Sequence, residues 1–337
     1  MKSSDIIKRF LLDNLSKHQK DIVQTAINQF GISRQAIHRH MNSLIKDNKV
    51  KAHGTTKGRH YELMPYVNYT KTIDLNIDFS IDKLLKNQIR PLLKSLPKNI
   101  LEIFEFATGA LLNNVQEHSN AMKLYVKLFI KHDEAHFIVS DNGIGIFEHI
   151  KSGLRLPNVQ LAAIELAKGN VTANPSEHSG DEMNAVIHLF DKVEIASSGQ
   201  SLSFINNRNE WKIYHSTQTK GTRMHLLINP SSNRTCSEIF NNIFSSGQKK
   251  ISIPLNLLET SNQSLINSKI KAKSVLRNIQ NYDVVEFDFK KIKLIGPAFA
   301  DTLVRETKEK NKYALIEWIN TNKTVDLLMS RALNRKY

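Results

Sequence analysis

One short segment of this chain constrains its fold more than any other. Residues 138–140, Ile-Val-Ser, have the apolar character of a buried strand, which ends at Asp141 and is followed by Gly143 and Gly145. Glycine lets the backbone turn tightly and pass close to another group, so the pattern predicts a shaped loop at a strand end. Upstream, the Asn-rich stretch 111–118 falls on a segment whose apolar residues have helical spacing.

A strand-end Asp with a DxGxG loop, preceded by a helical Asn box, resembles the nucleotide site of the GHKL ATP-binding superfamily (gyrase, Hsp90, histidine kinases and anti-sigma kinases). The resemblance implies a GHKL α/β sandwich over residues 77–232. It implies that Asp141 accepts the adenine amino proton and that Gly143 and Gly145 let the backbone approach the nucleotide. Thr222, in the stretch Lys-Gly-Thr-Arg, matches a Thr that supports Asp141 beneath the base.

The same resemblance implies ATP with Mg²⁺ as the cofactor. Asn114 matches the residue whose amide oxygen helps to hold Mg²⁺ against the phosphates, a suitable ligand for a hard cation. A helix is expected to begin near Asp181, and its free N–H groups would favour phosphate there. The further cofactor-binding candidates are Glu117, His118, His178, Ser179 and Gly180.

Two positions depart from the superfamily pattern. Hydrolysing members carry a Glu four residues before the metal Asn, where this chain has Ala110, and a methyl group cannot act as a general base. Glu182 stands where relatives have a second glycine, and its carboxylate is unfavourable beside phosphates. We therefore expect ATP binding with weak or no hydrolysis. A serine kinase of the anti-sigma type and a nucleotide-dead interaction scaffold remain the alternatives.

The N-terminal segment is strongly basic. The chain has a formal net charge of +15, and residues 1–60 contain twelve Lys/Arg against four Asp/Glu, a net of +8. An excess of this kind favours a polyanionic partner, nucleic acid first. More than half of the charge therefore lies in less than a fifth of the chain.

Residues 1–65 resemble a winged helix-turn-helix domain. Apolar spacing predicts helices in the first 15 residues, from Lys20 to Phe30 and from Arg34 to about Asp47, followed by a glycine-bounded hairpin. The third helix would enter the major groove of double-stranded DNA and the wing would contact phosphates. A small protein-interaction domain is the alternative. The DNA-binding candidates are Arg34, Gln35, His38, Arg39, Lys57 and Arg59.

Residues 248–337 alternate strands and helices and resemble a small STAS-like α/β domain, with 288–296 as the matching stretch. Regulatory STAS proteins carry a phosphorylatable Ser just beyond, but residues 296–299, Gly-Pro-Ala-Phe, offer no hydroxyl. We therefore expect a docking or self-association module, or a structural cap. Residues 66–76 are mixed and turn-rich, which predicts a linker.

The whole chain is thus predicted to be an α+β multidomain protein. No apolar run approaches the roughly 20 residues needed to span a bilayer, the start does not resemble a signal peptide, and Cys236 is the only cysteine. We expect a cytoplasmic, ATP-binding, DNA-associated regulator, either a transcriptional regulator or a DNA-linked sensor, for example in stress response or phage defence.

Overall fold

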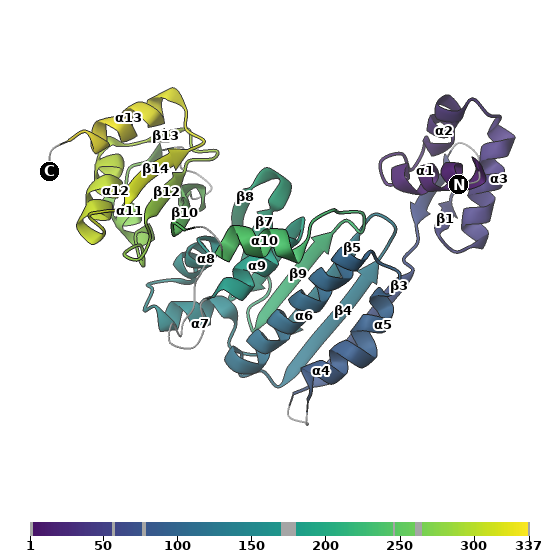
Figure 1. Ribbon diagram of the computed structural model, residues 1–337, viewed down its shortest axis with the longest axis horizontal. Coiled ribbons are helices and arrows are strands. Elements are labelled where there is room, and N and C mark those ends of the chain that lie inside the picture. Colours follow the sequence, from purple (N-terminus) through teal and green to yellow (C-terminus); the bar gives the residue numbers. More distant parts are fainter. Residues whose placement is uncertain are drawn as a thin grey trace.

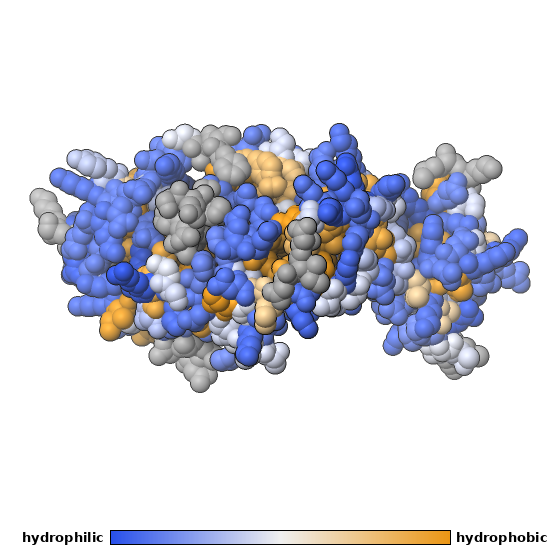
Figure 2. Space-filling view, turned by 90° about the horizontal axis from the view of Figure 1, so that it is seen from below, coloured by the Kyte–Doolittle hydropathy of each residue, from blue (hydrophilic) through white to orange (hydrophobic). Residues whose placement is uncertain are grey.

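The computed structural model describes residues 3–55, 58–75, 79–169, 180–244, 247–259 and 265–335. An N-terminal and a C-terminal region lie at opposite ends of a central sheet that is covered by helices (Figure 1). The surface seen from below is mostly hydrophilic, with smaller apolar areas near the middle of the molecule (Figure 2). Among the helices of the described residues, none has the length and apolar content that a membrane crossing requires.

The N-terminal region contains the helices and the hairpin that its apolar spacing predicts. Helix α2 ends at Gly31, whose φ of 65° is left-handed, and α3 begins after Ser33, whose Oγ accepts a hydrogen bond from the Ala36 N–H at 3.2 Å. The region has its own apolar core. Its elements are α1 (Ser3–Asn14), α2 (Ile22–Phe30), α3 (Arg34–Lys46), β1 (Val50–His53) and β2 (His60–Leu63).

The central sheet has the strand order β3-β4-β5-β9-β6-β7-β8, and each neighbouring pair is antiparallel. Its strands are β3 (Val67–Asp74), β4 (Lys123–Ile130), β5 (Ala135–Asp141), β6 (Lys192–Ser197), β7 (Gln200–Ile205), β8 (Glu210–His215) and β9 (Thr222–Ile228).

The prediction of a linker at residues 66–76 was wrong. Strand β3 occupies most of this segment and pairs with β4 from Val67, opposite Ile130, to Asp74, opposite Lys123. Its residues alternate between the core side and solvent, which is the period of a half-buried strand. Polar and β-branched residues on the solvent side hide this alternation in the composition.

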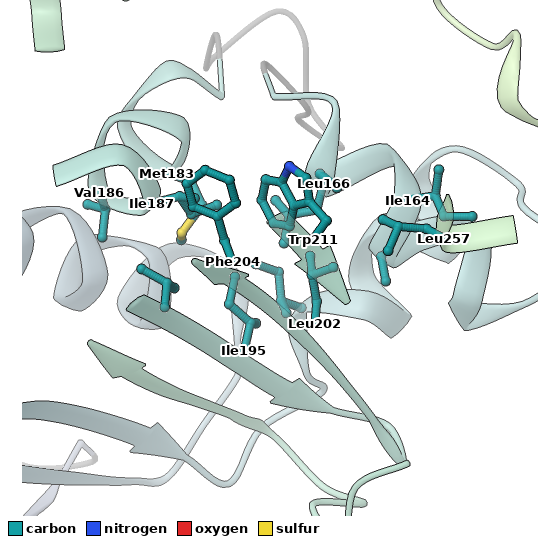
Figure 3. Packing of buried hydrophobic residues seen from close by; sticks show 14 of the residues in the cluster. Ile164, Leu166, Met183, Val186, Ile187, Ile195, Leu202, Phe204, Trp211 and Leu257 are labelled. Carbon is teal, nitrogen blue, oxygen red and sulfur yellow. The ribbon is translucent and has the colours of Figure 1, made fainter. Parts of the chain in front are cut away.

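Helices cover one face of the sheet (Figure 1). Met183, Val186 and Ile187 of α9 pack with Phe204 and other apolar side chains of the strands (Figure 3). The segments of this layer are α4 (Ile81–Leu84), the π-helix η2 (Leu85–Ile89), α5 (Arg90–Leu93), α6 (Lys98–His118), α7 (Ile146–Gly153), α8 (Val159–Ala167), α9 (Asp181–Leu189) and α10 (Cys236–Phe244). A short 3₁₀ helix, η3 (Asn206–Arg208), joins β7 to β8.

The central region continues beyond its predicted end at residue 232. Helix α10 packs on the helical layer, with the rings of Phe106 and Phe240 4.9 Å apart. The apolar spacing of α10 serves this packing, so the helix belongs to the central region and not to the connection that follows it.

The C-terminal region has a parallel sheet of order β10-β12-β14 flanked by helices. Its elements are β10 (Lys250–Pro254), η4 (Leu255–Leu258), β11 (Leu265–Ile266), α11 (Lys269–Val275), β12 (Val284–Asp288), β13 (Leu294–Ile295), α12 (Pro297–Lys310), β14 (Leu315–Ile319) and α13 (Lys323–Leu333). Its apolar core is continuous with that of the central region.

Helix α8 makes much of this connection. Residues 161–167 are all buried, and the helix contacts both the strands of the central sheet and elements of the C-terminal region. The Gln160 side chain donates to the Leu257 carbonyl at 3.1 Å, and Asn256 donates to the Trp211 carbonyl at 2.8 Å. The two regions therefore pack as one body.

The N-terminal region meets the central sheet through polar contacts at the turn between β4 and β5. His132 Nε2 lies 2.6 Å from Asp13 Oδ1, and Ser16 donates a hydrogen bond to Asp133. Because its core is separate, this region is held by contacts that solvent can replace.

Candidate functional site

Asp141 ends β5 as a buried carboxylate, with 6% of its surface exposed. Its Oδ1 accepts a hydrogen bond from the Gly143 N–H at 2.8 Å and its Oδ2 accepts one from the Thr222 N–H at 3.1 Å. Burial raises the pKa of Asp141, and these backbone N–H groups act against that rise. Each carboxylate oxygen can accept a second hydrogen bond, so the group can still receive a donor from a ligand.

The backbone around Asp141 is packed too closely for side chains. A β-carbon at Gly143 would lie 2.0 Å from the Ser119 carbonyl oxygen, and one at Gly221 would lie 2.0 Å from that of Asp141. Gly145 has a φ of +91°, which other residues rarely adopt. The Gly221 N–H donates to the Gly143 carbonyl at 2.9 Å, which joins the loop after β5 to the start of β9.

Thr222 joins the parts of this site that lie far apart in the sequence. Its N–H binds Asp141, and its Oγ1 accepts a hydrogen bond from the Ile146 N–H, at the start of α7, at 2.8 Å. Ser197 lies opposite Thr222 in the pairing of β6 with β9 and donates to the Gly221 carbonyl at 3.0 Å. Sequence reasoning missed Ser197, because only the strand register brings it to the site.

The end of α6 lies against the same loop. The Ile144 N–H donates to the carbonyl of Ser119, the residue that ends α6, at 2.8 Å. Glu117 and His118 lie on the last turn of the helix, and half-buried Asn114 lies one turn before them. The structure thus brings the predicted Asn box together with the glycine loop. Ala110, one further turn back, is buried and 8% exposed.

His149 of α7 adds a residue that the sequence did not indicate. Its ring stacks on that of His118 with centroids 5.3 Å apart. Burial lowers the pKa of His149, and His118 lowers it further. Since only the packing of α7 against the end of α6 forms this pair, no local motif could have identified it.

The predicted anion position lies at the start of α9. Gly180 caps the helix with a left-handed φ of 76° and no side-chain hydrogen bond, and Asp181 and Glu182 follow in the first turn. These carboxylates already complement the positive helix end, so a phosphate there would meet two negative charges. Glu182 is exposed. His178 and Ser179 lie outside the described residues.

The basic candidates of the N-terminal region gather around His38. Arg34, Gln35 and Arg39 of α3 are exposed, as is Arg59 before β2, whereas His38 is half-buried. Burial lowers the pKa of His38, followed by the charges of Arg59 and then Arg34. The helix and the hairpin therefore present one positive face. Lys57 lies outside the described residues.

Metal binding by protein groups alone has little support within the described ranges. They contain no group of three or more His, Cys, Asp or Glu side chains that could hold a metal ion. Any Mg²⁺ near Asn114 would therefore need phosphate oxygens as further ligands.

Comparison with known proteins identifies part of the chain. Residues 271–326 match the family model of the STAS-like domain of unknown function (DUF4325), so the chain has a C-terminal STAS-like domain, as its strand and helix pattern predicts. The match covers α11 to the start of α13. No curated protein matches the chain.

Two crystal structures show a weak likeness. One is an IclR transcriptional regulator from Alicyclobacillus acidocaldarius, with 12% identity, a TM-score of 0.23 and coverage of 73% of this chain and 96% of that one. The other is HmgR from Pseudomonas aeruginosa, with 9% identity, a TM-score of 0.19 and coverage of 72% and 95%. Likeness at this level does not establish a shared fold.

Proposed function

We propose that this protein is an ATP-binding, DNA-associated regulator, with nucleotide in the central region and double-stranded DNA on the N-terminal region. The observation that carries the proposal is the buried Asp141 carboxylate, fixed by Gly143 and Thr222 beside a loop whose packing excludes side chains. Such a group is costly to bury unless it has donors, and a ligand amino group would supply another.

Adenine suits this carboxylate and guanine does not. The remaining lone pairs of Asp141 can accept the exocyclic amino group of adenine, whereas guanine places a carbonyl oxygen at the equivalent position. The absence of side chains at Gly143 and Gly145 leaves the backbone available for close approach to the nucleotide. Asn114 would supply one oxygen ligand to Mg²⁺, which neutralises phosphate charge when bound.

DNA binding is supported by the positive face of α3 and the hairpin. We propose that the N-terminal region is a winged helix, in which Gln35 and Arg39 reach base edges and Arg59 contacts phosphate. Burial, followed by the charges of Arg59 and Arg34, lowers the pKa of His38 and so favours its neutral imidazole, which can donate or accept a hydrogen bond.

The way in which the regions are joined supports a regulatory role. The STAS-like domain shares its core with the central region, so we propose that it first serves as an intramolecular partner of the nucleotide domain. Ala110 cannot act as a general base, so ATP would serve as a bound ligand that is hydrolysed slowly or not at all.

Calorimetry with ATP and Mg²⁺ tests the nucleotide site. Asp141→Ala removes a charge-assisted hydrogen bond, and affinity should fall by about 2 kcal/mol, roughly 30-fold. Asp288→Ala is the matched control, because Asp288 also ends a strand, is 4% exposed and accepts a backbone hydrogen bond from Lys290 at 2.9 Å. It should leave ATP affinity unchanged. An equal loss of ATP affinity in both variants would mean that the substitutions act by disturbing the fold and not by removing a contact to the nucleotide.

A further inference from the structure

A cavity separate from the Asp141 site lies on the central sheet, on the face turned away from α6 and α9. Met224 and Leu226 of β9 point into the helix-covered core, so Arg223 and His225 point to the opposite side. The cavity has a volume of about 400 Å³ and is formed by β6, β7, β8 and β9 with the loop that precedes β9. This volume is within the range of small-molecule sites.

Two opposite charges line this cavity. Glu194 of β6 lies opposite His225 in the strand pairing, and Arg223 lies opposite Ala196, so the two charged residues are diagonal neighbours. Diagonal neighbours in a sheet lie roughly 7–8 Å apart at their Cα atoms, close enough for long side chains to meet. Yet within the part of the chain that is described, Glu194 pairs with no Lys or Arg, and Arg223 pairs with no Asp or Glu.

His225, which lies opposite Glu194 in the strand pairing, does not neutralise it. Burial, followed by the nearby His136, lowers the pKa of His225 to about 4, so its ring is uncharged at neutral pH. The rings of His136 and His225 stack with centroids 5.2 Å apart and share a hydrogen bond of 2.9 Å between Nδ1 and Nε2. The uncharged ring of His225 therefore lines the cavity and is held in place by His136.

Hydroxyl groups complete the polar lining. Burial, followed by a hydrogen bond to Glu194, raises the pKa of Tyr214 to about 12, so its hydroxyl keeps its proton. Ser201 lies opposite Tyr214 on β7 and acts against that rise in pKa. The cavity thus has a carboxylate with a hydroxyl at one side and a free guanidinium at the other.

We propose that this cavity is a second ligand site, which binds a free α-amino acid. The α-carboxylate would pair with the Arg223 guanidinium, whose planar donors match a carboxylate, and the α-ammonium would pair with Glu194. Arg223 directly follows Thr222, which supports Asp141 on the other face, so the two sites lie back to back across β9. The amino-acid site stands independently of ATP binding and would give the regulator its small-molecule input.

Binding of each standard amino acid to the full-length chain, by thermal shift and then calorimetry, tests the site. We expect at least one amino acid to bind. Propionate and propylamine each retain only one of the two charges, so each should bind at least about tenfold more weakly. Arg223→Gln and Glu194→Gln should each weaken binding of the amino acid by about tenfold or more. Lys192→Gln, on the same strand as Glu194 but outside the cavity, should not.

The outcomes separate this site from the nucleotide site. Unchanged ATP affinity in the Arg223 and Glu194 variants, with lost amino-acid binding, supports two independent sites. Failure of every amino acid to bind the wild type at millimolar concentration would overturn the proposal. Propionate binding as tightly as the amino acids, or full affinity in Glu194→Gln, would also overturn it, because the site would then recognise only an anion.

Discussion

The buried ion pair in α8 gives the sharpest prediction about how the central and STAS-like regions are joined. The side chains of Glu165 and Lys168 are 2% and 1% exposed, and Lys168 Nζ lies 2.5 Å from Glu165 Oε1. Lys168 also donates to the Arg277 carbonyl, in the C-terminal region, at 3.4 Å. Burial lowers the pKa of Lys168 and raises that of Glu165, so each group depends on the other to stay charged.

Replacement of Lys168 by Met leaves the Glu165 carboxylate buried without a counter-charge. Loss of one partner from a buried pair costs about 3–5 kcal/mol, whereas replacement of both by apolar residues is neutral or stabilises by about 1–4 kcal/mol. We therefore expect Lys168→Met to lower the free energy of unfolding by several kcal/mol, and the added change Glu165→Leu to restore it.

Urea unfolding of the full-length chain measures these changes. Lys151→Met is the matched control, since Lys151 pairs with Glu148 at the same i,i+3 spacing and 2.8 Å, but the side chains are 32% and 38% exposed. The control should cost less than about 1 kcal/mol. If Lys168→Met costs no more than Lys151→Met, the pair does not stabilise the contact between the two regions.

Three further predictions concern DNA, hydrolysis and pH. Arg39→Ala should weaken binding to preferred DNA sites by roughly 1–3 kcal/mol, whereas Arg59→Ala should weaken binding to all DNA sequences alike. Fluorescence anisotropy with labelled DNA of both kinds distinguishes these effects. Wild-type affinity in both variants would show that this face does not contact DNA. Ala110→Glu places a carboxylate one turn before Asn114, the proposed Mg²⁺ ligand, and should raise ATP turnover in a phosphate-release assay by up to about 10²–10⁴-fold. Rapid ATP hydrolysis by the wild type would contradict a role in binding alone. Hydrogen bonds from Lys291 and Lys212 lower the pKa of Glu210 from 4.5 to about 2, so its stabilisation is complete above pH 4.5 and is lost as the pH falls through 2. Glu210→Gln should therefore reduce the pH dependence of unfolding in that window, and an unchanged profile would show that the contact with the STAS-like region contributes nothing.

Local patterns in the sequence account for much of the fold. Apolar spacing located α3 to within about a residue and indicated the helix that contains residues 111–118, because each helix buries one face against a core. The start of α9 also lies where it was expected, at Asp181. The C-terminal alternation identified the STAS-like domain, which the family match confirms. The strand end at Asp141 and its spaced glycines also follow from local chemistry.

Features that depend on contacts distant in sequence could not be predicted. Strand β3 resembled a linker, because the residues of β4 that pair with it lie 49 to 63 positions further along the chain. Ser197 and His149 join the site only through strand register and helix packing. The cavity around Arg223 and Glu194 exists only once β6 and β9 are paired, since neither residue belongs to a local motif.

Native mass spectrometry of the full-length chain, purified without chelators, tests the central claim most directly. We expect a species that is heavier by one adenine nucleotide and Mg²⁺, either as purified or after ATP and Mg²⁺ are added. An equal concentration of GTP should not displace this nucleotide. A chain that remains free of nucleotide in excess ATP and Mg²⁺, or that takes up GTP as readily, would contradict it.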